Sequence, residues 1–154
     1  MARTLRFEAI YPYSPEEVWV ALTDPVAIGE WLMPNDFLPV VGHRFTFRTK
    51  PAPGFDGIVQ CEVTELDPPR RLAYSWKGGG IDTIVRYLLE GEGASTRLVM
   101  EQSGFTGLKG FMVSKILGGG WKRMIAERLP AAAARVEGGV YRAEPEAPLS
   151  RCDS

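Results

Sequence analysis

The stretch GFTGLKGFMVSKILGGGWKRMIAERLPAAAARV, residues 104–136, decides the fold, because it has the pattern of a long helix. Apolar residues recur in its second half at intervals of three and four, with charged residues between them. The first half has a shorter pattern of the same kind, and the glycines at 118–120 predict a break between a lead-in helix and the long helix. Pro130 has no backbone N–H and predicts a kink. The predicted buried stripe consists of Trp121, Met124, Ile125, Leu129, Ala132, Ala133 and Val136.

Upstream of the helix, apolar and polar residues alternate in short runs that predict strands. Turn-sized links join most of these runs, so neighbouring strands are expected to pair in antiparallel fashion. Two helix starts, Ser14-Pro15 with Glu17 and Asp24-Pro25, follow the first run. A sheet with one apolar face needs a helix to cover it. The predicted strands are residues 4–11, 44–49, 58–66, 71–77, 81–89 and 96–103.

These elements predict an α+β fold in which a curved antiparallel sheet of about six strands wraps a long C-terminal helix. Two short helices follow the first strand. Residues 4–137 are expected to form a single domain. The segment 138–154 shows no periodic pattern and is expected to be a mobile C-terminal tail.

The composition excludes several classes of protein. Eighteen basic and nineteen acidic residues give a net charge of −1, so no nucleic-acid partner is expected. No apolar run is long enough to span a bilayer, and no membrane partner is expected. The two cysteines, Cys61 and Cys152, have no metal-ligand spacing, so neither a zinc site nor a disulfide framework is predicted. The N-terminal residues lack the pattern of a secretory signal, which favours a cytoplasmic location.

Four groups of residues stand at fixed places in this order: SPEEVW at 14–19 with ALTDP at 21–25, WLMP at 31–34, DPPRRL at 67–72 running to SW at 75–76, and STRL at 95–98 with SGF at 103–105 before GW at 120–121. Together they resemble the helix-grip superfamily (SRPBCC, START-like), and most closely the homologues of the heat-shock-protein-90 ATPase activator C-terminal domain. The resemblance covers about residues 4–136 and is specific for the fold rather than for a chemistry. It implies that the space between sheet and helix holds hydrophobic ligands.

A curled sheet is concave on one face, so a straight helix laid over it leaves a gap that side chains or a ligand must fill. The sheet residues expected to line this gap are Phe45, Phe47, Tyr74, Trp76, Tyr87, Met100 and Gln102. Trp31 is expected at one end, and Phe111, Met112, Trp121 and Ile125 are expected to close over the gap.

The same set of residues also fits a solid core, and the pattern leaves both readings open. A buried Gln102 must be hydrogen-bonded, whether by a tyrosine hydroxyl, a water or a ligand. Arg86 is expected to point outward, and would face a ligand carboxylate if its strand were shifted by one residue.

No catalytic residue is predicted. His43 is the single histidine, and no nucleophile pattern accompanies it. Asp36 and Asp56 lie in loops that are expected at the cavity rim. The triple glycines at 78–80 and 118–120 lack the Lys-Ser/Thr of a phosphate-binding loop. No cofactor and no metal are therefore expected.

We therefore expect a small soluble protein that binds a hydrophobic or aromatic molecule between sheet and helix. A homodimer is compatible with this expectation. Two alternatives remain. One is an enzyme of the polyketide cyclase or dehydratase type that uses the same cavity, and the other is an interaction module like the chaperone activator. Binding is preferred because no catalytic group stands out.

Overall fold

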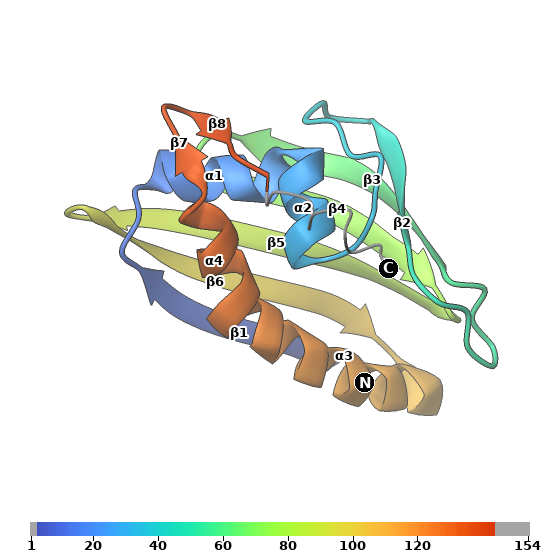
Figure 1. The fold of residues 1–154 in the computed structure, drawn as a ribbon. Coiled ribbons are helices and arrows are strands. Elements are labelled where there is room, and N and C mark those ends of the chain that lie inside the picture. The colour runs from blue at the N-terminus through green and yellow to red at the C-terminus, as the bar shows by residue number, and fades with distance from the viewer. Residues whose placement is uncertain (1–2, 144–154) are drawn as a thin grey trace, which may run out of the picture.

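A computed structural model describes residues 3–143 of the chain. It confirms the predicted α+β architecture, with a long helix and two short helices on one face of a curved sheet (Figure 1). The elements are β1 Arg3–Tyr11, α1 Pro15–Thr23, α2 Pro25–Trp31, β2 Arg44–Arg48, β3 Ile58–Asp67, β4 Arg71–Gly78, β5 Ile81–Glu92, β6 Ser95–Phe105, α3 Gly107–Arg123, η1 Met124–Arg128, α4 Leu129–Ala133, β7 Val136–Glu137 and β8 Val140–Tyr141.

The six-stranded sheet has the order β1-β6-β5-β4-β3-β2, and all its neighbours are antiparallel. Strands β2 to β6 follow one another as a meander, because each link between them is a turn or short loop. Strand β1 pairs with β6 instead, since α1 and α2 carry the chain across the sheet before β2 begins. The two edges, β1 and β2, are therefore joined through the helical layer.

The short helices begin as their sequence predicts. Ser14 accepts a hydrogen bond from the backbone N–H of Glu17, whose carboxylate accepts one from the Ser14 N–H in return. Asp24 caps α2 by accepting from the backbone N–H groups of Val26 and Ala27 at 2.8 and 3.2 Å. These caps fix where each helix starts, and so place both helices against the sheet.

The break predicted at glycines 118–120 is wrong, because α3 runs through them without interruption. Gly110, Ser114 and Trp121 form the buried face of α3, and this packing outweighs the low helix propensity of glycine. The π-helical turn η1 ends at Arg128, two residues before Pro130, and the backbone N–H of Leu129 donates to the Met124 carbonyl. The wider turn admits a residue without an N–H.

A C-terminal hairpin of β7 and β8 crosses residue 138, where the predicted tail begins. Gly138 and Gly139, with φ of 60° and 80°, form the two-residue turn between β7 and β8. Tyr141 is buried, and its hydroxyl donates to the Glu30 carboxylate on α2. Burial and that carboxylate raise the pKa of Tyr141, so the phenol remains protonated. The remaining part of the predicted tail, 144–154 with Cys152, lies outside the described residues.

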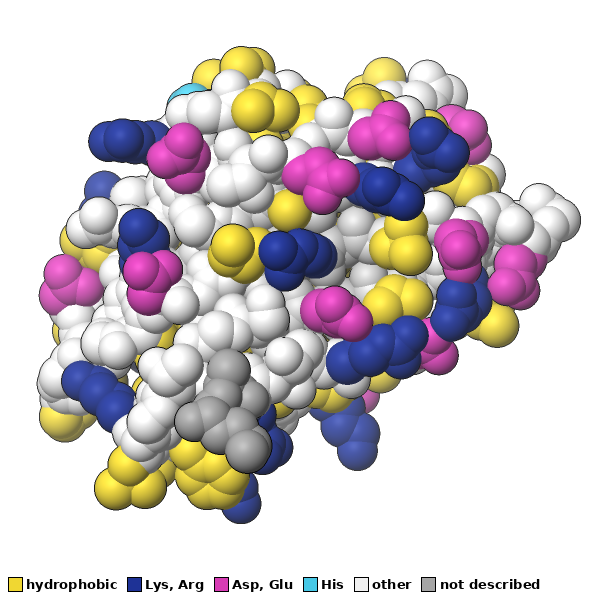
Figure 2. Space-filling view, turned by 180° about the vertical axis from the view of Figure 1, so that it is seen from behind, with side chains coloured by type: hydrophobic (Ala, Val, Ile, Leu, Met, Phe, Trp, Pro, Cys, Tyr) yellow, Lys and Arg dark blue, Asp and Glu magenta, His cyan; other side chains and the backbone are white. Residues whose placement is uncertain are grey.

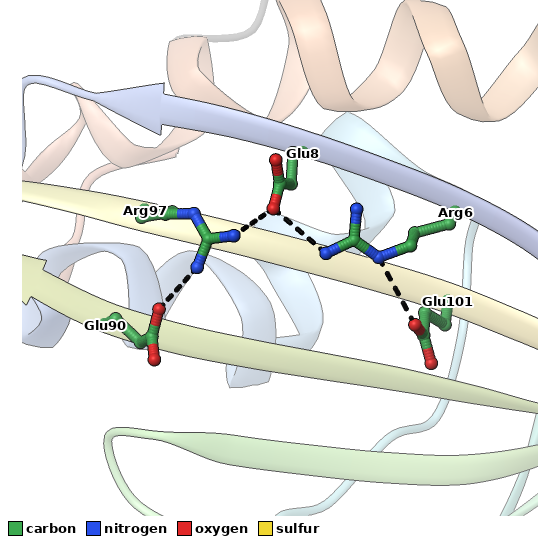
Figure 3. Close-up of polar contacts among 5 residues, drawn as sticks. All are labelled: Arg6, Glu8, Glu90, Arg97 and Glu101. Atoms are coloured by element: carbon green, nitrogen blue, oxygen red, sulfur yellow. Dashed lines mark hydrogen bonds and ion pairs between the residues drawn. The ribbon is translucent and has the colours of Figure 1, made fainter.

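The outer face of the sheet is charged and exposed to solvent (Figure 2). An ion-pair network crosses β1, β6 and β5 (Figure 3). Arg6 contacts Glu8 at 3.0 Å and Glu101 at 3.4 Å, while Arg97 contacts Glu90 at 2.5 Å and also Glu8. The hydrogen bond from Arg6 lowers the pKa of Glu8. Exposed ion pairs of this kind contribute little to stability, and the apolar residues Leu88 and Val99 lie among the charges of this face.

Candidate functional site

The inner face of the sheet carries an aromatic layer that the C-terminal helix covers. None of its side chains is more than 4% exposed, and neighbouring ring centroids lie 5.1–6.4 Å apart. At these separations the rings are in edge and tilted contact. The layer consists of Phe37, Phe45, Phe47, Tyr74, Trp76, Tyr87 and Trp121.

Sequence patterns missed Phe37 because it lies in the aperiodic segment before β2. Asn35 organises that segment: its side-chain oxygen accepts from the Phe37 N–H at 3.0 Å, and its amide donates to the carbonyls of Pro25 and Met33. These bonds turn the Phe37 ring onto Phe45, at 5.1 Å and nearly perpendicular. The sequence signal that could have identified Phe37 is the asparagine two residues before it, because Asn commonly forms an Asx turn.

A line of hydrogen bonds runs beneath the layer and ties the helix to the sheet. The Trp121 indole N–H donates to Gln102 Oε1 at 2.7 Å. The Gln102 amide donates to Thr83 Oγ1 at 2.9 Å, and Thr83 donates to the Trp76 carbonyl at 2.9 Å. Both ends of the Gln102 amide are therefore satisfied within the protein, by a tryptophan and a threonine that sequence reasoning did not consider.

Two tyrosine hydroxyls face each other inside the layer. Tyr74 and Tyr87 share a hydrogen bond of 2.8 Å between their oxygens, and both rings are buried. Burial raises the pKa of both phenols. The pair is therefore neutral at physiological pH and offers a hydroxyl donor rather than a charge.

A groove adjoins this core where α2, the C-terminal helix and the hairpin meet. Its volume is about 520 Å³. Three arginines face two glutamates around it, and Trp31, Tyr141 and two alanines provide apolar walls. Arg123 is paired with Glu127 at 3.8 Å. The lining residues are Glu30, Trp31, Arg123, Glu127, Arg128, Ala131, Ala132, Arg135 and Tyr141.

Trp31 connects the groove to the interior. Its side chain is 2% exposed and belongs to the same buried cluster as the aromatic layer. Its indole N–H donates to the Ala21 carbonyl at 2.8 Å, which locks α2 onto α1. Sequence placed Trp31 at one end of a cavity, and the structure places it in the wall of this groove. No periodic signal pointed to the groove, because its residues come from α2, α3, η1, α4 and β8, which are separate in the sequence.

Most residues predicted to line the gap share the buried core. Phe111 and Met112 do not, since their side chains are 42% and 57% exposed. This corrects the expectation that they close over the sheet. In this half of α3, Gly110 and Ser114 are the fully buried residues, and Val113 and Leu117 pack partly buried against the core. The predicted residues that are buried are Trp31, Phe45, Phe47, Tyr74, Trp76, Tyr87, Met100, Gln102, Trp121 and Ile125.

The loop residues weighed for chemistry serve local structure. His43 Nε2 lies 2.9 Å from the Asp36 carbonyl, and its ring stacks on Phe45. Asp36 accepts from the Thr46 N–H at 2.7 Å, and Asp56 accepts from the Ile58 N–H at 3.0 Å. Within residues 3–143, no group of three or more His, Cys, Asp and Glu side chains is placed to hold a metal ion. No described helix is long and apolar enough to cross a membrane.

Comparison with known proteins agrees with this architecture. The model of the family described as Activator of Hsp90 ATPase homolog 1-like protein matches residues 12–134. No curated protein matches the chain. Protein MLL2253 from Mesorhizobium loti is 33% identical with a TM-score of 0.79, and the match covers 88% of this chain and 99% of that one.

Two further solved structures are similar. CalU16 from Micromonospora echinospora is 27% identical with a TM-score of 0.67, over 81% of this chain and 73% of that one. The Aha1 dimer from Colwellia psychrerythraea is 20% identical with a TM-score of 0.67, over 80% of this chain and 91% of that one. At that identity the second likeness shows the fold alone.

Proposed function

The chain belongs to the family of Activator of Hsp90 ATPase homolog 1-like proteins, and we propose that it binds a hydrophobic or aromatic small molecule between the sheet and the C-terminal helix. The ligand enters through the groove beside Trp31. One observation carries the proposal: Trp31 belongs to the buried core and also lines the open groove. A cytoplasmic location is part of the same proposal.

The groove suits a molecule with an apolar body and a negatively charged end. Ala131, Ala132 and Trp31 supply apolar surface, and the arginines outnumber the glutamates. Glu127 is paired with Arg123, whereas Arg128 has no carboxylate partner among the residues that the structure describes. Small-molecule sites typically combine apolar walls with a few polar groups that orient the ligand.

Deeper binding requires the helix to move, because side chains fill the space beneath it. The π turn η1 is the place where the helical hydrogen-bond pattern is already altered, and Ile125 in η1 is buried against the core. Arg128 of η1 and Ala131 of α4 line the groove. A small displacement of η1 would join the groove to the aromatic layer without breaking regular α-helical bonds.

The test uses isothermal titration with naphthoate, an aromatic ring carrying one carboxylate. We expect saturable one-to-one binding. Ala131→Trp fills the groove and should weaken binding about tenfold or more, as an ordinary steric exclusion of the ligand. Ala134→Trp is the matched control, since Ala134 is also exposed but does not line the groove. Equal binding by both variants, or none by the native protein, would refute the proposal.

A second titration tests whether the groove prefers a negatively charged ligand. Arg128→Gln should weaken naphthoate binding but leave the binding of neutral naphthalenemethanol unchanged, because only the carboxylate needs the guanidinium. A similar loss for both probes would show that Arg128 contributes apolar contact instead.

A cyclase or dehydratase activity finds less support. Such chemistry needs a group that exchanges a proton at neutral pH. Among the described residues, the buried polar side chains are Thr83, Thr96, Gln102 and Ser114, and the tyrosine pair remains neutral. The protein-interaction role and the homodimer also stay proposals, and sedimentation of the purified chain tests the dimer directly.

A further inference from the structure

Helix α3 carries a second apolar stripe, which faces away from the sheet. Leu108, Met112 and Ile116 recur every fourth residue and are 76%, 57% and 75% exposed. Gly110 and Ser114 lie on the opposite side of the helix and are buried. An ordinary surface helix has polar residues on its outward side, whereas this outward stripe of α3 is apolar.

Basic side chains flank the stripe and no acidic residue interrupts it. The sequence contains no Asp or Glu between Glu101 and Glu127. Phe111, on the edge of the stripe, lies under two cations: the Arg3 guanidinium is 5.2 Å and the Lys115 ammonium 5.1 Å from its ring centroid. The remaining basic residues of α3 are Lys109, Lys122 and Arg123.

We infer that this outward face of α3, made of Leu108, Phe111, Met112 and Ile116 with the basic residues around them, docks on the surface of an anionic lipid bilayer. A helix with apolar side chains on one face and lysines at its borders lies in the plane of a membrane interface, with the apolar side chains among the acyl chains. The lysines then meet lipid phosphates at the level of the headgroups.

The positive charge of this face favours an anionic bilayer over a second copy of the chain as its partner. Two such faces brought together about a two-fold axis would place lysines and arginines against one another with no acidic residue of α3 between them. An anionic bilayer neutralises all of them at once. The expectation of no membrane partner rested on the lack of a spanning run, and surface docking needs no such run. The inference does not rest on the proposed ligand site, although Arg123 borders both the groove and this face.

The experiment measures co-sedimentation of the full chain with vesicles. One set is phosphatidylcholine alone, and the other contains about 30% phosphatidylglycerol. We expect binding to the anionic vesicles only. Raising the salt to about 0.5 M should release most of the protein, because the charge attraction is screened. No binding to anionic vesicles at low salt overturns the inference.

A pair of variants tests the apolar contact. Met112→Ser with Ile116→Ser keeps every charge and should weaken binding about tenfold or more, since two inserted side chains are lost. Ile10→Ser with Val140→Ser is the matched control, because these side chains are 63% and 60% exposed elsewhere on the molecule. All four positions are exposed, so folding is preserved. Equal losses in the two variants overturn the inference.

A second pair tests the charges. Lys109→Gln with Lys115→Gln should weaken binding about tenfold or more and reduce its salt dependence. Arg44→Gln with Lys50→Gln, near the sheet edge opposite β1, removes the same charge and should change little. If sedimentation instead shows a dimer that the Met112 and Ile116 variant abolishes, the face pairs two copies and the bilayer assignment is wrong.

Discussion

Replacing Tyr11 by Phe should destabilise the protein through a single buried carbonyl. In the π turn, the Leu129 N–H bonds to the Met124 carbonyl. In the same π pattern, the Ile125 carbonyl would accept a hydrogen bond from the backbone N–H of residue 130, but Pro130 has no N–H. The Tyr11 hydroxyl from β1 donates to it instead, at 2.6 Å. Tyr11 thus replaces a helical hydrogen bond that the proline removes.

The size of the effect follows from burial. Tyr11 is 3% exposed and Ile125 is 2% exposed, so no water replaces the lost hydroxyl readily. Leaving a buried acceptor without a partner costs about 1 to 3 kcal/mol. For a domain of this size, that lowers the melting temperature by about 2 to 12 °C. Urea unfolding followed by circular dichroism gives the free energy directly.

A double-mutant cycle identifies the cause. In a Pro130→Ala background the chain regains an N–H, so Tyr11→Phe should cost less than it does in the native background, by about 1 kcal/mol. Tyr13→Phe is the control: Tyr13 is half-buried, its hydroxyl has no partner among the described residues, and the change should stay within about 0.5 kcal/mol. An identical cost of Tyr11→Phe in both backgrounds would refute the compensation.

Three further outcomes are expected. Trp121→Ala removes a buried indole that packs on Trp76, and should cost about 3 to 5 kcal/mol in urea unfolding; a cost under about 1 kcal/mol would mean that the helix is not docked there. Ser14→Ala removes the reciprocal cap of α1 and should cost about 1 kcal/mol by the same assay, so an unchanged midpoint contradicts the cap. Because Arg6 holds the pKa of Glu8 below 4.5 in the folded protein, this carboxylate stabilises the fold above pH 4.5, and the contribution is lost as the pH falls through the lowered pKa. Glu8→Gln should therefore make the melting temperature fall less steeply as the pH drops below 4.5. An unchanged pH dependence in this range would show that Glu8 does not contribute.

The strands were predictable because each buries one face. Period-two alternation is a direct consequence of that burial, as in β6, where Leu98, Met100 and Gln102 are all fully buried. The helix starts at Ser14 and Asp24 were predictable for a different reason, since capping depends on a few neighbouring residues. The family resemblance, confirmed by the match over 12–134, rests on the same local signals in order.

The candidate site was only partly predictable. Alternation identified the sheet residues of the aromatic layer, but Phe37 reached it through an aperiodic turn. The groove joins Glu30, Arg128 and Tyr141, which lie far apart in the sequence. No local pattern relates such residues, because their proximity depends on how α2, the C-terminal helix and the hairpin pack together.

By itself, the sequence determined which segments are strands, where the short helices begin and which face of each strand is buried, because these depend on neighbours a few residues away. The tertiary structure decided which side of α3 meets the sheet. Residues 107–123 carry apolar side chains on two sides, and either stripe satisfies a helical period. The side with Gly110 and Ser114 packs on the sheet, while Leu108, Met112 and Ile116 are left outside. That choice is made by close packing between distant parts of the chain.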